Sequence, residues 1–128
     1  LLTEKSIYMK KTMLVMLVLG ISLSSFAGLK EKDVLGTWKY KVEADQGDLT
    51  GTVTIEKKEG KLVAEVNTAE GEVLAFSKVE IKEDNVLYME LDTGYELLEL
   101  SLTVKGKSME GTVGNEQGSF PMTMEKVE

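Results

Sequence analysis

The stretch GTWKYKVEA, residues 36–44, decides the fold, because its apolar and polar residues alternate. From Trp38 to Ala44 the even-numbered residues are Trp, Tyr, Val and Ala, and the odd-numbered residues between them are Lys or Glu. Successive side chains of a β-strand point to opposite faces, so this period of two places one face in an apolar core and the other in water. The turn-forming stretch DQGD, residues 45–48, then ends the strand.

The alternation continues toward the C-terminus and is interrupted by turn signals about every ten residues. Seven further strands are predicted, with their inward-facing apolar residues in the ranges 49–55, 62–66, 73–81, 87–91, 98–104, 109–113 and 120–124. On the fourth strand of the chain, the residues expected to face inward are Val73, Ala75, Val79 and Ile81. No helical period is sustained after Gly36, and the connections are too short for crossover helices. We therefore expect an all-β protein, an eight-stranded antiparallel up-and-down meander barrel, with a short helical turn within residues 29–35.

Composition excludes several classes of chemistry. The chain has 128 residues, no Cys, no His and a net charge of −7, and all 15 of its basic residues are Lys. Without His or Cys it has no Ser-His or Cys-His nucleophile pair, no zinc site of the usual ligand set and no disulfide. The acidic balance opposes a nucleic-acid partner, because such binding depends on Lys and Arg neutralising phosphates. The length allows one compact domain.

The N-terminal region has the features of an export signal. Lys10 and Lys11 precede the apolar run MLVMLVL, residues 13–19, and small residues follow up to Ala27. We expect residues 9–27 to be a signal peptide, residues 1–8 to be upstream sequence or a misassigned start, and residues 28–128 to be the mature domain. The mature domain has 12 lysines and 21 acidic residues, a net charge of −9. No Cys is available for lipid attachment, so a periplasmic or secreted protein without a stable membrane anchor is predicted.

The segment DVLGTWKY, residues 33–40, resembles the opening of the lipocalin and calycin barrels, in which Gly-x-Trp follows a short helical turn. The chain is especially similar to small secreted bacterial lipocalin-like domains, which have Gly-Thr-Trp near the start and repeated Gly-Thr-Val segments. The resemblance implies that Trp38 packs across the closed end of the barrel beneath a basic residue of the last strand. That residue is usually Arg, and Lys126 is the basic residue near this position here.

The barrel interior is the candidate ligand site. An eight-stranded barrel either fills with side chains or holds one small ligand. Methionine suits both, because its flexible side chain fills irregular gaps and also lines adaptable apolar pockets. A carrier requires a cavity of roughly 300 Å³ or more. If the interior is hollow, the expected ligand-binding residues are Trp38, Tyr40, Met89, Met109, Phe120, Met122 and Met124.

The outer face of the predicted barrel carries more apolar residues than a solvated face needs. Seven of them point outward on four consecutive strands in the predicted register, namely Val63, Leu74, Phe76, Val86, Tyr88, Tyr95 and Leu97. Neighbouring apolar residues that form one patch indicate an interface, so a homodimer through this face is predicted. A bulge near residues 75–77 would instead turn Leu74 or Phe76 inward.

Two motifs raise alternative chemistry. Asp92-Thr93-Gly94 matches the aspartic-protease tripeptide, but it falls where a β-turn is required between two alternating runs. The acids beside Gly47 lack the ligand spacing of a calcium hand.

We expect no catalytic residue, no metal site and no cofactor. The sequence predicts an exported, non-enzymatic binding protein for a small apolar ligand. The alternative is a protein-interaction or inhibitor module with a filled core that uses the outer apolar face.

Overall fold

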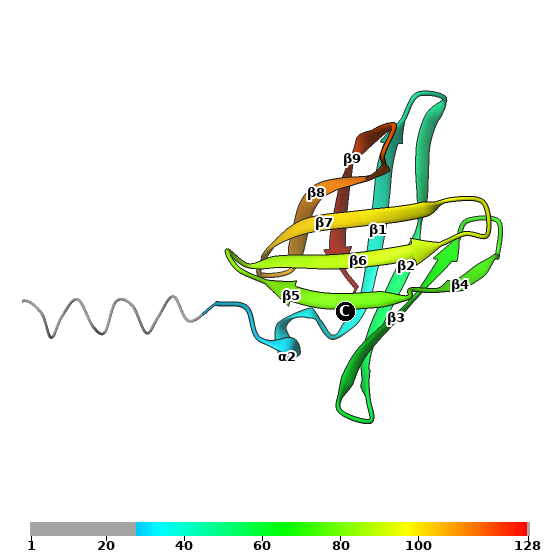
Figure 1. Ribbon diagram of the computed structural model, residues 1–128. Coiled ribbons are helices and arrows are strands. Elements are labelled where there is room, and N and C mark those ends of the chain that lie inside the picture. The colour runs from blue at the N-terminus through cyan, green and yellow to red at the C-terminus, as the bar shows by residue number, and fades with distance from the viewer. Residues whose placement is uncertain (1–27, 128) are drawn as a thin grey trace, which may run out of the picture.

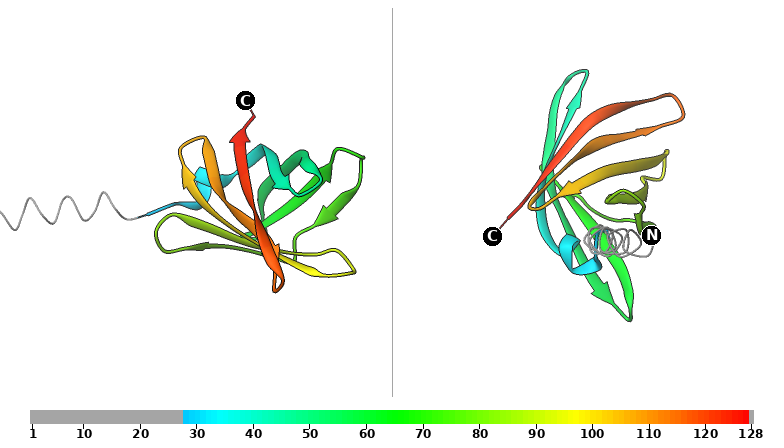
Figure 2. Two further views of the ribbon diagram at one scale, coloured as in Figure 1. Left: turned by 90° about the horizontal axis from the view of Figure 1, so that it is seen from above. Right: turned by 90° about the vertical axis from the view of Figure 1, so that its left-hand side faces the viewer.

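A computed structural model describes residues 28–127 of the chain, and it shows an all-β fold (Figure 1). The predicted signal peptide, residues 9–27, and the stretch 1–8 lie outside the described residues. One antiparallel sheet curls back on itself into a half-barrel, which we call the barrel, and Figure 2 shows this curl from two further sides. Within residues 28–127, no helix is long and apolar enough to cross a membrane.

Consecutive strands of the chain pair with each other, except β4 and β5, and the first strand also pairs with the last. The sheet order is β4-β3-β2-β1-β9-β8-β7-β6-β5. The strands are β1 (Gly36–Ala44), β2 (Gly47–Lys58), β3 (Lys61–Thr68), β4 (Val73–Ala75), β5 (Lys78–Lys82), β6 (Val86–Asp92), β7 (Leu97–Lys105), β8 (Ser108–Asn115) and β9 (Gly118–Lys126). Inward-facing residues of β1, β6, β7, β8 and β9 are those that the alternation predicted.

The sheet has nine strands and not the predicted eight, because the expected fourth strand is broken at Phe76–Ser77. Its first part, β4, pairs with β3, whereas its second part, β5, pairs with β6. The backbone switches partners at the break: Phe76 N donates to the Ala64 carbonyl oxygen of β3 (2.9 Å), and Ser77 N donates to the Glu90 carbonyl oxygen of β6 (2.8 Å). The two edge strands of the sheet are thus consecutive in the chain.

The break also corrects the predicted register of β4. Val73 and Ala75 are exposed, although the alternation placed them inward, whereas Leu74 and Phe76 pack against the core. On β5 the inward residues are odd-numbered again, as Val79 and Ile81 pack against the core. The side-chain period of a strand is two, so the irregular residues between Phe76 and Val79 give the 73–76 stretch the opposite facing to the one predicted.

The short helix α2 (Glu31–Val34) lies at the end of the barrel where β1 begins (Figure 1). It lies within the predicted range 29–35, and its Val34 is fully buried. Trp38 is also fully buried, and its indole Nε1 donates to the Val34 carbonyl oxygen at 2.9 Å. A buried indole N–H needs such an acceptor. The bond ties the helix to the first strand.

Lys126 lies over the same tryptophan. It pairs with Trp38 across β1 and β9, and its Nζ is 5.3 Å from the centroid of the indole ring. This is the contact that the lipocalin resemblance implies, with an ammonium in place of the usual guanidinium. A cation within about 6 Å of an aromatic face is attracted by the ring quadrupole.

Lys126→Arg is expected to stabilise the fold, by about 0.5 kcal/mol, because a guanidinium can lie flat on the indole. Lys126→Met keeps the apolar stem and loses the charge, so it is expected to lower stability by a similar amount. Urea unfolding of the three proteins measures both changes. Equal stability of the Arg and Met variants would show that the contact contributes nothing.

Candidate functional site

The interior of the barrel divides into a filled half and a hollow half. The filled half lies beside α2, where the largest fully buried side chains gather: Trp38, Ile55, Leu87, Met89, Leu102, Met109 and Met124. The hollow half lies toward the opposite end, which we call the mouth. The mouth is surrounded by the β1–β2, β3–β4, β6–β7 and β8–β9 connections, at the upper right of Figure 1.

The hollow half holds a cavity of about 460 Å³. Its wall is mostly apolar and draws on β1 to β4 and β6 to β9. The apolar lining consists of Tyr40, Val42, Ala44, Leu49, Val53, Val66, Leu74, Phe76, Leu91, Tyr95, Leu98, Leu100, Val113, Phe120 and Met122. Pockets for small molecules measure roughly 300–1,000 Å³, so this cavity has the size of a ligand site.

Small residues contribute to the unfilled space in this half. Ala44, Val53, Val66 and Val113 occupy inward positions of β1, β2, β3 and β8, alongside larger wall residues such as Phe76 and Met122. Short side chains on several strands of one barrel layer leave space that longer ones would fill.

Tyr40 is the one large aromatic side chain that β1 places in the hollow half. Its ring lies across Gly51 of β2, where an added Cβ would come 2.8 Å from both Cε2 and the hydroxyl oxygen. The ring of Tyr40 can lie there because Gly51 has no side chain. Burial, and secondarily the negative charge of Glu70, raise the pKa of Tyr40.

Polar lining groups lie at the mouth. They are Thr68, Glu72, Thr93, Glu96 and Asn115. Glu72 N donates to Thr68 Oγ1 (3.1 Å) in the β3–β4 connection. Glu96 N donates to Thr93 Oγ1 (3.2 Å) in the β6–β7 connection. The amide of Asn115 on β8 donates to the Glu96 carboxylate. Both glutamates are exposed at the rim of the cavity.

The seven residues predicted to bind a ligand separate into two groups. Tyr40, Phe120 and Met122 line the cavity. Trp38, Met89, Met109 and Met124 are fully buried in the filled half and are not part of the cavity wall. Sequence reasoning missed Glu72 and Glu96, among others. For Leu74 and Phe76 it favoured the outer face and gave a bulge near residues 75–77 as the alternative that turns them inward, which is the placement in the structure.

The predicted outer interface is also divided. Leu74 and Phe76 turn inward to the cavity, which corrects their outward placement, and Tyr95 lies at the mouth with 97% of its surface exposed. Val63, Val86, Tyr88 and Leu97 stay on the outer surface. Between the last two lie Glu90 and Glu99, which face each other across β6 and β7. The homodimer through this face stays a prediction.

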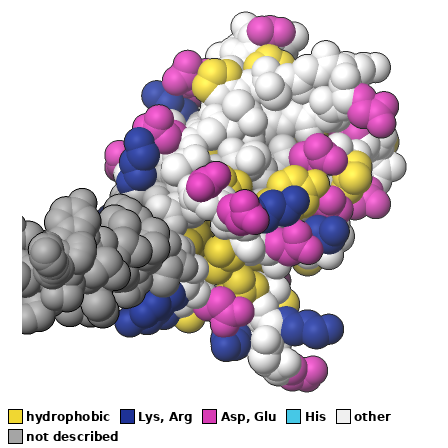
Figure 3. Space-filling model, turned by 60° about the vertical axis from the view of Figure 1, so that its left-hand side comes forward, with side chains coloured by type: hydrophobic (Ala, Val, Ile, Leu, Met, Phe, Trp, Pro, Cys, Tyr) yellow, Lys and Arg dark blue, Asp and Glu magenta, His cyan; other side chains and the backbone are white. Residues whose placement is uncertain are grey.

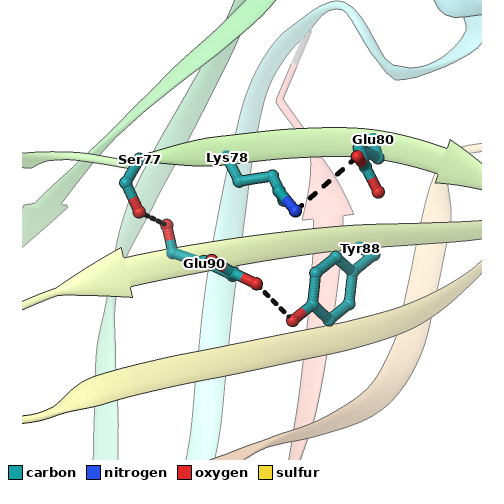
Figure 4. Close-up of polar contacts among 5 residues, drawn as sticks. All are labelled: Ser77, Lys78, Glu80, Tyr88 and Glu90. Carbon is teal, nitrogen blue, oxygen red and sulfur yellow. Dashed lines mark hydrogen bonds and ion pairs between the residues drawn. The ribbon is translucent and has the colours of Figure 1, made fainter.

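Polar contacts surround Tyr88 on this outer face (Figure 4). Its hydroxyl donates to Glu90 Oε2 at 2.7 Å, and Lys82 Nζ lies 4.2 Å from its ring centroid. The hydrogen bond to Glu90 is the main cause that raises the pKa of Tyr88. On the neighbouring strand, Ser77 Oγ donates to the Glu90 carbonyl oxygen, and Lys78 and Glu80 form an ion pair at 3.9 Å.

A second hollow lies where β5 and the first part of β3 separate. It is lined by Leu29, Glu31, Lys61, Leu62, Ser77, Lys78, Val79, Glu80 and Ile81. Figure 3 shows apolar side chains between the projecting β2–β3 hairpin and the body of the barrel. This hollow has more polar than apolar lining, which distinguishes it from the cavity at the mouth.

The tripeptide considered for catalysis has a local structural role. Asp92 Oδ1 accepts the backbone N–H of Gly94 at 2.9 Å, so the Asp92-Thr93-Gly94 tripeptide closes the β6–β7 connection. Across residues 28–127, no group of three or more Asp or Glu side chains is arranged to hold a metal ion.

Comparison with known proteins supports the barrel character of the fold. No family model matches the chain, and no curated protein matches it either. Among solved structures, the chain is similar to a redesigned β-barrel, with a TM-score of 0.59 and 16% sequence identity. The match covers 76% of this chain and 94% of the redesigned barrel. At this identity the likeness shows the fold alone.

Proposed function

We propose that this protein is an exported, non-enzymatic, lipocalin-like carrier that binds a small apolar molecule in the cavity at the mouth. The observation that carries the proposal is the cavity itself, about 460 Å³ with a mostly apolar wall that opens at one end of the barrel. The filled half provides the stable base. Trp38 and its neighbours form a packed core, so the fold does not depend on side chains filling the other half.

Family membership and export belong to the same proposal. Support for the family comes from the Gly36-Thr37-Trp38 opening after a helical turn, and from Lys126 over the indole. Support for export comes from the basic and apolar residues of the 9–27 segment. The polar lining groups of the cavity are few and lie at its rim, which favours an apolar ligand over a sugar or an inorganic ion.

A neutral apolar dye tests this function. N-phenyl-1-naphthylamine is expected to bind with one-to-one stoichiometry and to fluoresce strongly, because the cavity excludes water from it. Val66 lies on the cavity wall of β3, so Val66→Trp fills part of the space and is expected to weaken binding at least tenfold. Glu65→Trp adds the same side chain on the exposed face of the same strand and serves as the control.

Fluorescence titration of the three proteins measures the dissociation constants, and circular dichroism checks that each is folded. Unchanged affinity in folded Val66→Trp would show that the dye binds elsewhere. Mass spectrometry under native conditions, on protein purified from its own host, would identify a retained natural ligand by its mass.

A further inference from the structure

Two carboxylates lie at the rim of the cavity. Glu72 and Glu96 are the charged residues of the cavity wall, and they come from two different connections at the mouth, β3–β4 and β6–β7. Within residues 28–127, neither carboxylate takes part in an ion pair. The threonine hydrogen bonds of the two turns hold the backbone N–H groups of both glutamates, and Asn115 donates to the Glu96 carboxylate.

The rest of the mouth has the same sign of charge. The four segments around it, residues 43–50, 67–75, 91–98 and 113–121, contain eight acidic residues and no lysine. The connections at the opposite end, residues 28–35, 56–61, 82–86 and 104–109, contain eight lysines and six acidic residues. A rim of one charge around an apolar opening concentrates the field at that opening and attracts ligands of the opposite charge.

Aromatic side chains complete the mouth. Tyr95 is almost fully exposed at the rim, and Phe120 lies exposed on the cavity wall of β9. Exposed aromatic faces near carboxylates favour organic cations, because the ring quadrupole and the carboxylate charge attract the same head group. The apolar cavity below them accepts a hydrocarbon tail.

We propose that the ligand is a cationic amphiphile, with its hydrocarbon part in the cavity and its ammonium group between Glu72 and Glu96. The inference rests on the proposed carrier function and adds the charge of the ligand to it. Fatty carboxylates of the same length are repelled by the rim and bind more weakly than neutral alcohols.

Three probes with the same twelve-carbon tail test this charge preference: dodecyltrimethylammonium, dodecanol and dodecanoate. Each displaces N-phenyl-1-naphthylamine from the full chain at low salt, below the concentration at which the probe forms micelles. We expect the ammonium to bind about tenfold tighter than the alcohol, and the carboxylate to bind weakest. Raising the salt to about 0.5 M should reduce the difference, because exposed charges are screened.

Variants locate the preference at the rim. Glu72→Gln combined with Glu96→Gln is expected to remove most of the tenfold preference and to leave dodecanol binding unchanged. Glu83→Gln combined with Glu125→Gln makes the same change in net charge on exposed residues toward the opposite end of the barrel, and it should keep the preference.

The outcomes separate the two proposals. If dodecanol and the ammonium both fail to displace the dye, the carrier function is contradicted. If dodecanol binds but dodecanoate binds as tightly as the ammonium, only the charge preference is contradicted. An equal loss of preference in both double variants would show that net charge acts, and not the two rim carboxylates.

Discussion

Trp38→Ala is expected to lower the free energy of unfolding by about 3–5 kcal/mol, the usual cost of removing a large aromatic side chain from a packed core. Trp38 is fully buried in the filled half, and its N–H is bonded to the Val34 carbonyl oxygen, so the variant leaves a void and a buried acceptor without its donor. Domains of this size have a total stability of about 5–15 kcal/mol. Much of the variant should therefore be unfolded well below the melting temperature of the parent.

Trp38→Phe provides the graded control. It keeps most of the ring volume and removes the N–H donor, so we expect a loss of about 1–2 kcal/mol. Urea unfolding followed by circular dichroism suits all three proteins, because the chain has one tryptophan and the variants lack it. A loss below 1 kcal/mol in Trp38→Ala would contradict the assignment of this residue to the core of the filled half.

Gly111→Ala is expected to cost about 3 kcal/mol or to prevent folding, although it adds a single methyl group. A Cβ at this position of β8 would overlap the carbonyl oxygen of Ser101 on β7 and would lie 2.9 Å from the Leu102 Cα. Both obstacles are backbone atoms, which a change of side-chain rotamer does not move. The clash can be relieved only by separating two paired strands.

Thr112→Ala is the matched control for Gly111→Ala. Thr112 is the next residue of β8 and is exposed, so its truncation should cost less than about 1 kcal/mol. Thermal unfolding of both variants measures the difference. Equal melting temperatures would show that β7 and β8 do not approach as closely as described.

Most of the strand pattern was predictable from the sequence. One face of each strand is buried, and the alternation of apolar and polar residues shows which face it is. Residues such as Trp38, Leu87 and Leu102 face inward as the period of two requires. An irregularity near residues 75–77 was recognised as an alternative, but the division of the strand between two partners was not predicted, since it depends on which neighbour each backbone N–H reaches. The inward-facing residues are even-numbered at Leu74 and Phe76 and odd-numbered at Val79 and Ile81.

The cavity was less predictable than the fold. The sequence suggested methionines for the cavity wall, and Met122 lies there, yet Met89, Met109 and Met124 fill the core. Whether a barrel layer is filled depends on the summed volumes of side chains from several strands, which no single stretch of sequence records. The acidic mouth could be recognised only from the topology, because alternate turns of the meander lie at the same end of the barrel.

The central claim is that the cavity at the mouth binds an apolar ligand, and methyl resonances test it most directly. In a titration with dodecanol followed by carbon-13 methyl spectroscopy, the largest shifts are expected for Val66, Leu100, Val113 and Met122, which line the cavity. The methyl groups of Leu87, Met109 and Met124 in the filled half should shift little. Shifts confined to outer residues such as Val63 and Val86, with the cavity methyl groups unchanged, would contradict the claim.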